Sequence, residues 1–357
     1  MKKEIAEFNV LRAAAIIIIL IHHLPNFTIN FFNLNNFGIP IDVSFIIDLL
    51  RYFGLGIFIF ISGFLLEFND KKMSGLTDAV GFLIKRYVRI LPLYLIAYIL
   101  FIFIFRNTIE HLNIFSITAH VLGLQILLSS KYCDTVVTLW YIGLIISYYF
   151  VFVLISLYGK SKIKLLGILS LIAILWLCGK MILGIGDQRF ILYLPVFIFG
   201  ILSARTDILK YVGFKSFLVA FCLLIFCAGV YTAFVYPQTA LFIPIKPNLF
   251  SAISFAGILI LNIIMALTVI ITYFLSKTLA PVKNSKLIRL ISYSSFCIYL
   301  FHRPFITVLL RIYHPEDPML KLLYVVVCGF PLVFIAGYFI QKQYDSFIVP
   351  ALSRWFK

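Results

Sequence analysis

Long runs of apolar residues alternate with short polar connections along almost the whole chain. Eleven of these runs approach the roughly 20 residues that a helix needs to cross a bilayer. They fall at about 9–26, 45–67, 88–106, 113–129, 136–158, 163–183, 189–204, 214–236, 251–275, 290–311 and 319–341. Because a helix satisfies its backbone hydrogen bonds within the segment, the pattern predicts an all-α polytopic membrane protein.

The run at 113–129 is shorter and more polar than most, and it carries His120 and Gln125. If it crossed the membrane, two lysine-rich loops at 160–164 and 277–289 would face outward, against the preference of basic loops for the cytosol. If it stays on the outer side, every basic cluster lies in the cytosol. We therefore predict about ten transmembrane helices plus one interfacial or re-entrant segment, with both termini cytosolic.

The composition fits the same class. Of 357 residues, 63% are hydrophobic and 12% are charged, about half the fraction of charged residues in soluble domains. The formal net charge of +16 lies beside the apolar runs, at residues 2–3, 71–89, 160–164, 205–215, 277–289 and 354–357. There it orients the helices and matches anionic lipid headgroups, so membrane lipids and not nucleic acid are its expected partners. The runs use up almost the whole chain, which predicts a single integral-membrane domain over residues 1–357.

The first apolar run carries ionisable residues, Arg12, His22 and His23. Such side chains cost on the order of 3 kcal/mol each on insertion scales, so they are functional candidates by default. On a helix, Arg12 and His23 share one face and lie roughly 16 Å apart along the axis, whereas His22 points about 100° away. The alternative is that His23 lies at the headgroup interface and Arg12 anchors the helix in the membrane.

Further strings also carry candidate chemistry. Arg86 and Arg89 lie three residues apart at the cytosolic start of the third run, where guanidinium groups suit phosphates arriving from the cytosol, or merely anchor the helix. Small residues at 54, 56, 62 and 63 favour close helix packing. His302 and Arg303 form a second pair at about mid-depth of the ninth expected span.

These strings, in this order, resemble the membrane-bound acyltransferase-3 family, O-acyltransferases of bacterial surface glycans and related substrates. The residues that carry the resemblance are Arg12 with His23, Arg86 with Arg89, Phe58 to Phe64, Leu139 to Leu144, Leu194 to Gly200 and Ile298 to His302. The chain departs from some relatives at Ile145 and Ile146, where that subgroup has glutamates.

The resemblance implies an acyl-CoA-dependent O-acyltransferase of the cytoplasmic membrane. Acetyl-CoA is the expected donor and a glycan or lipid-linked saccharide the expected acceptor. No metal site is expected, because the scattered histidines at 111, 120 and 314 lack the spacing of metal ligands. The catalytic residues that the resemblance implies are His23, as general base, with Arg12 and His302; the implied donor-binding residues are Arg86 and Arg89; and the implied acceptor-binding residues are Trp140, Tyr141 and Tyr299. A covalent acyl-histidine stays open as a variant, and the two aromatic residues at 140 and 141 are equally typical of an interfacial belt.

Two alternatives to this prediction stay open. A glycan or lipid transporter could use buried histidine and arginine as a proton relay. The lack of an internal repeat and the scarcity of intramembrane carboxylates argue against a transporter. Asp42 and Asp48 are expected to pair with Arg51. The other large fold of membrane O-acyltransferases, which uses a buried histidine and asparagine, fits the order of the motifs poorly.

Overall fold

The structure is a computed structural model that describes residues 5–29, 44–69, 73–105, 113–129, 132–133, 136–235, 252–279 and 285–355. Throughout these ranges the regular structure is helical, and no strand occurs in them. The basic residues at 2–3, 71–72, 283 and 357, and the expected pairing of Asp42, lie outside the described residues. Asp48 does pair with Arg51, at 3.5 Å between carboxylate and guanidinium.

Ten helical stretches in the described part of the chain are long and apolar enough to cross a membrane, which confirms the predicted class. They are Ala6–Asn26, Phe45–Asn69, Leu76–Ile104, Val137–Tyr158, Lys162–Leu183, Gln188–Thr206, Phe214–Ala233, Phe255–Thr278, Lys286–Ile312 and Pro318–Leu352. Their α-helices are α1 (Ala6–His23), α2 (Phe45–Asn69), α3 (Leu76–Ile104), α6 (Trp140–Tyr158), α7 (Lys162–Cys178), α8 (Gln188–Thr206), α9 (Phe214–Val230), α11 (Ala252–Thr278), α13 (Lys286–Ile312), α14 (Pro318–Tyr324), α15 (Phe330–Gln343) and α16 (Val349–Trp355).

The segment 113–129 folds into two short helices, α4 (Ile114–Val121) and α5 (Gln125–Leu128). Neither is long enough to cross hydrocarbon. The chain turns between them at Gly123, whose φ of 70° suits glycine. The prediction that this run is not a full crossing is therefore confirmed.

The third helix begins at Leu76 and not at about 88, so its predicted start was wrong. The backbone N–H of Ser74 donates to the Asp78 carboxylate at 2.9 Å and closes the first turn. With 29 residues, α3 is about 43 Å long, longer than the hydrocarbon layer of roughly 30 Å. Arg86 and Arg89 therefore lie inside this helix and not at its start.

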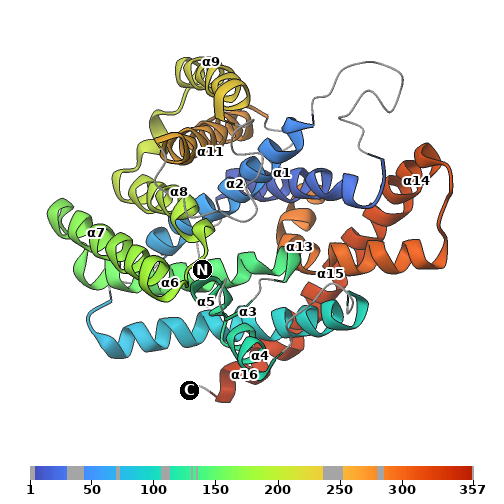
Figure 1. Ribbon diagram of the computed structural model, residues 1–357, viewed down its shortest axis with the longest axis horizontal. Helices are drawn as coiled ribbons and strands as arrows, with labels where there is room; N and C mark the ends of the chain where they lie inside the picture. The colour runs from blue at the N-terminus through green and yellow to red at the C-terminus, as the bar shows by residue number, and fades with distance from the viewer. Residues whose placement is uncertain are drawn as a thin grey trace. The chain divides into compact units, whose positions relative to one another are not determined.

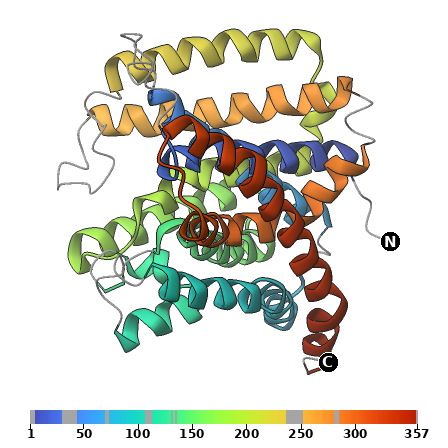
Figure 2. The same cartoon turned by 90° about the vertical axis from the view of Figure 1, so that its right-hand side faces the viewer.

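By its internal contacts the chain divides into two compact units. The first comprises residues 1–68, 195–295 and 309–334, and the second comprises residues 69–194, 296–308 and 335–357. In the first unit, α9 and α11 lie side by side (Figures 1 and 2) and α1 packs against α11. In the second unit, α6 contacts α3, α5 and α7. The acyltransferase domain predicted over the whole chain thus contains two such units.

The helices differ in how they meet the membrane. Most side chains of α6 are buried, whereas α7 and α9 expose most of their apolar side chains. Exposed apolar side chains on a membrane helix are those that contact lipid, because lipid tails are as apolar as the side chains themselves. Helix α6 is therefore a central helix of the second unit, and α7 and α9 are peripheral.

Candidate active site

Helix α1 carries the first set of predicted catalytic residues. Arg12 and His23 are both half-buried on it, and their 11-residue separation gives roughly 16 Å along one helix face. The helix ends at His23 because Pro25, two residues on, has no backbone N–H to continue the ladder. At a helix C-terminus the macrodipole favours a cation, so the site stabilises an imidazolium formed when His23 takes up a proton.

Three contacts surround the two adjacent histidines. The Nδ1–H of His22 donates to the carbonyl oxygen of Ile47 in α2 at 2.7 Å. The rings of His22 and His23 lie 4.6 Å apart between centroids. The side-chain amide of Asn26 lies 3.5 Å from Nδ1 of His23 and donates to the His23 carbonyl oxygen at 3.2 Å. The predicted base therefore lies in a polar end of an otherwise apolar helix.

The predicted donor-binding arginines lie on α3 in the second unit. Arg86 is half-buried, and its guanidinium carbon lies 5.1 Å from the ring centroid of Phe82 and 5.9 Å from that of Tyr149. Arg89 is exposed. Three residues apart on a helix, the two side chains are about 60° apart around the axis. One guanidinium is thus held by aromatic rings and the other is open to an incoming anion.

The structure brings together four residues from two predicted strings, Trp140 with Tyr141 and Tyr299 with His302. Trp140 and Tyr141, at the start of α6, are each 8% exposed and in edge contact with one another. The Tyr141 ring meets that of Tyr299 at 5.1 Å, and the Tyr299 ring lies 6.1 Å from that of His302. The hydroxyl of Tyr299 donates to the backbone carbonyl of Thr138. These residues form one buried cluster of the second unit, which we call the aromatic cluster.

His302 is fully buried at the inner side of this cluster. Its Nδ1 lies 2.8 Å from the Tyr299 carbonyl and 3.2 Å from the Ile298 carbonyl, both on its own helix. Carbonyl oxygens only accept, so Nδ1 carries the hydrogen and a neutral ring keeps its lone pair on Nε2. The predicted burial of His302 is confirmed, whereas Arg303 is only half-buried.

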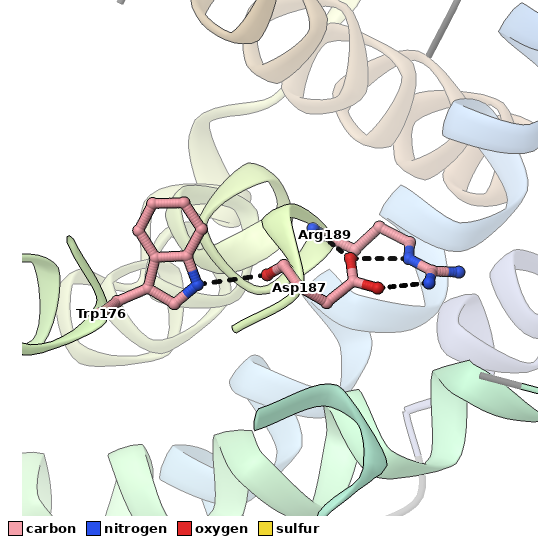
Figure 3. Close-up of polar contacts among 3 residues, drawn as sticks. All are labelled: Trp176, Asp187 and Arg189. Atoms are coloured by element: carbon pink, nitrogen blue, oxygen red, sulfur yellow. Dashed lines mark hydrogen bonds and ion pairs between the residues drawn. The ribbon is translucent and has the colours of Figure 1, made fainter. Parts of the chain in front are cut away.

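Asp187 and Arg189 were not predicted as candidate site residues. Asp187 lies in the connection between α7 and α8 and Arg189 near the start of α8, and Figure 3 shows the two paired and Asp187 in contact with Trp176. Arg189 donates from Nε to the Asp187 carboxylate at 2.8 Å, and the Trp176 indole donates to the Asp187 carbonyl at 3.2 Å. The guanidinium carbon of Arg189 lies 4.4 Å from the ring centroid of Trp140. The available signal was an acidic and a basic residue two apart, behind two glycines, in a short connection between apolar runs.

Comparison with known protein families identifies the family of the chain. The model of the acyltransferase-3 family, described as an acyltransferase domain, matches residues 5–342. A multi-pass helical membrane protein with this match is an integral-membrane acyltransferase. The chain belongs to the acyltransferase-3 family. Searches of curated proteins and of solved structures gave no match.

Proposed function

We propose that the protein transfers an acetyl group from acetyl-CoA to a hydroxyl of a surface glycan or lipid-linked saccharide, in the cytoplasmic membrane. The observation that carries the proposal is the placement of Arg12 and His23 on one face of α1, in a chain that belongs to an acyltransferase family. Family membership also supports acyl transfer over the transporter alternative.

On the donor side, Arg86 and Arg89 bind the phosphate groups of the acyl-CoA. Guanidinium groups pair with phosphate through charge-assisted hydrogen bonds, which are stronger than neutral ones. The rings of Phe82 and Tyr149 support this role because they restrain the Arg86 side chain before the donor binds. Arg89, which is exposed, supplies the second contact.

In the transfer step His23 acts as general base. It accepts the proton of the acceptor hydroxyl while the hydroxyl oxygen bonds to the thioester carbonyl carbon. The carbon–sulfur bond then breaks, and the CoA thiolate takes the proton back from the imidazolium. The helix C-terminus supports this cycle because it stabilises the charged intermediate form of His23, and Arg12 supplies a fixed positive charge on the same face.

On the acceptor side, we assign substrate contact to Tyr141 and Tyr299 of the aromatic cluster. Trp140, predicted as a third contact, is buried under the guanidinium of Arg189, so its contribution is to hold that arginine and the neighbouring rings in place. The neutral His302 ring carries its hydrogen on Nδ1, because Nδ1 faces two carbonyl oxygens. Its Nε2 therefore keeps a lone pair, with which His302 orients a polar group of the substrate.

The test uses membranes that contain the protein at matched abundance and radiolabelled acetyl-CoA. His23→Ala is expected to lower transfer into the endogenous acceptor by about 10²- to 10⁴-fold, the usual share of a general base. Wild-type transfer by this variant would remove His23 from the mechanism.

A second pair of variants tests the donor contacts. Arg86→Ala with Arg89→Ala is expected to raise the KM for acetyl-CoA by on the order of tenfold or more, because two charge-assisted contacts are lost. The matched control is Lys160→Ala with Lys162→Ala, two exposed basic residues, of which Lys160 lies between α6 and α7 and Lys162 begins α7. An unchanged KM in the arginine variant, or an equal rise in the control, would refute the phosphate role.

A further inference from the structure

The tandem histidines at the end of α1 are not equivalent. The proposed function assigns a role to His23 alone, and His22 lies on another face of the helix. Yet His22 makes the more directional contact of the two, a hydrogen bond of 2.7 Å from its Nδ1 to the carbonyl oxygen of Ile47. Since Ile47 is in the first turn of α2, this bond ties the end of one helix to the start of the next.

This bond does not depend on the charge of His22. A carbonyl oxygen can only accept, so Nδ1 carries a hydrogen in the neutral ring that makes the bond, and it keeps that hydrogen when the ring is protonated. The contact therefore holds in both protonation states. Such a bond is suited to positioning, and not to carrying the proton that the reaction moves.

The end of α1 is a place where positioning matters. The last carbonyls of a helix have no partners within it, so terminal turns fray. Here the helix stops at His23 itself, and Leu24–Asn26 continues as a single tighter turn. A base in the last turn of a fraying helix would sample many positions, and a misplacement of about 1 Å in a reacting group can cost on the order of 10²-fold in rate.

His22 also contacts its neighbour directly. The two rings lie 4.6 Å apart with 56° between their planes. On the other side, the amide nitrogen of Asn26 is 3.5 Å from Nδ1 of His23. The His23 ring is therefore bordered by the His22 ring, which is itself fixed to α2, and by the Asn26 amide.

We propose that His22 is a positioning residue for acyl transfer, which holds the His23 ring in place by anchoring the end of α1 to the Ile47 carbonyl. The inference rests on the proposed function, in which His23 is the general base. It assigns no chemical step to His22.

The experiment separates the hydrogen bond from the ring. His22→Phe keeps an aromatic ring beside His23 but removes the donor, and His22→Asn keeps an N–H close to the position of Nδ1. Both are assayed in membranes with radiolabelled acetyl-CoA, with transfer divided by the amount of folded protein from size-exclusion chromatography. The matched control is His314→Phe, an exposed histidine beyond the end of α13.

For His22→Phe we expect kcat to fall by about 10- to 100-fold, with the KM for acetyl-CoA unchanged, and for His22→Asn we expect most of this loss to be recovered. A purely structural role would lower the amount of folded protein and leave kcat per folded molecule at the wild-type value. Wild-type kcat in His22→Phe, a parallel rise in KM, or no recovery in His22→Asn would each overturn the proposal.

His23→Ala, assayed alongside, distinguishes the failure of this inference from the failure of the proposed function. Retained transfer in His23→Ala refutes the general base and the positioning role together. Loss of transfer there, combined with wild-type kcat in His22→Phe, refutes only the role of His22.

Discussion

Arg205 and Glu67 form an ion pair in the first unit, in which Nε of the arginine donates to the carboxylate at 2.8 Å and a second guanidinium nitrogen donates at 3.2 Å. Glu67 is near the C-terminal end of α2 and Arg205 near that of α8. These are the second and sixth candidate spans, so both helices run in the same direction across the membrane. Had 113–129 crossed, α8 would run the other way and its end would lie about 30 Å from that of α2.

A second contact within the same unit supports this count. The hydroxyl of Ser292, near the start of α13, donates to the side-chain oxygen of Asn9, near the start of α1, at 2.9 Å. These are the ninth and first candidate spans, and their starts lie on the same side of the membrane only when an even number of crossings separates them, here the first to the eighth span. The two polar contacts therefore agree with the prediction that was made from the lysine-rich loops.

Removal of one partner of the ion pair is expected to destabilise the protein. Both side chains are about three-quarters buried, with 24% and 23% exposed. Arg205→Ala therefore leaves the Glu67 carboxylate without this partner in a partly buried position. We expect the free energy of unfolding to fall by about 1–3 kcal/mol, measured by thermal unfolding in detergent. The charge-swapped double variant, Glu67→Arg with Arg205→Glu, should recover part of the loss.

The control for this prediction is another ion pair of the same unit. Lys210 and Asp207 lie 3.7 Å apart, with 54% and 75% of their side chains exposed. Exposed pairs contribute about 0–1 kcal/mol, so Lys210→Ala should leave the unfolding temperature almost unchanged. Equal effects of Arg205→Ala and Lys210→Ala would mean that the buried pair does not stabilise the contact between α2 and α8.

Two glycines allow α2 and α8 to approach each other closely. A Cβ on Gly63 would overlap the carbonyl oxygen of Phe197, and one on Gly200 would overlap that of Phe60. Gly200→Ala should therefore push the helices apart and destabilise the fold by about 1–3 kcal/mol, as overpacking does. The measurement is the yield and unfolding temperature of the purified variant.

Gly229→Ala in α9 is the matched control, because no atom lies within 4 Å of a Cβ built there. It should be neutral or slightly stabilising, since alanine favours a helix more than glycine does. If Gly200→Ala were tolerated as well as Gly229→Ala, the close approach of the two helices would not be required for stability.

Hydropathy located the spans but not their ends. The apolar run of the third span begins near residue 88, whereas α3 begins at Leu76. Residues such as Asp78 and Lys85 are compatible with a helix but not with hydrocarbon. Apolar content therefore locates the part of the helix within the membrane and not the turns that extend beyond it. The glycines at 54, 56 and 63, in contrast, were predicted as packing positions, and a Cβ at each would crowd a neighbouring helix.

The candidate site was predictable only in part, for a related reason. Arg12 and His23 lie on one helix, so helical geometry alone puts them on one face. The contact between Tyr141 and Tyr299 joins residues far apart in sequence and depends on how α6 and α13 pack, which no spacing encodes. Arg189 was not predicted because its place in the site depends on the contact between its guanidinium and the Trp140 ring, which the sequence does not show.

A buried polar network in the second unit joins α3 to the segment 113–129. Gln125 donates to the Tyr94 hydroxyl at 3.2 Å, and that hydroxyl lies 2.8 Å from Nδ1 of His120. The Tyr98 ring stacks on His120 at 4.6 Å between centroids. His120 was singled out in the sequence as a polar residue of the run 113–129, and its burial indicates a structural role.

Tyr94→Phe tests that role because it removes one hydroxyl from the centre of the network. The variant leaves the Gln125 amide and the His120 ring without this partner, so the free energy of unfolding should fall by about 1–3 kcal/mol. Acetyl transfer per folded molecule should stay at the wild-type value. Tyr158→Phe, at an exposed position at the end of α6, is the control. A loss of turnover in Tyr94→Phe at wild-type stability would instead connect the network to catalysis.

The orientation of the chain is predicted from the positive-inside rule and can be tested at two exposed positions. Asn113 precedes α4 and is expected outside, whereas Lys160 lies between α6 and α7 and is expected in the cytosol. Each is replaced by cysteine after the six native cysteines are replaced by alanine or serine. In spheroplasts, a membrane-impermeant maleimide should label Asn113→Cys at once and Lys160→Cys only after the membrane is opened. The opposite pattern would invert the orientation and move Arg86 and Arg89 away from cytosolic acyl-CoA. Equal labelling of both positions would mean that they share a side, against an odd number of crossings between them.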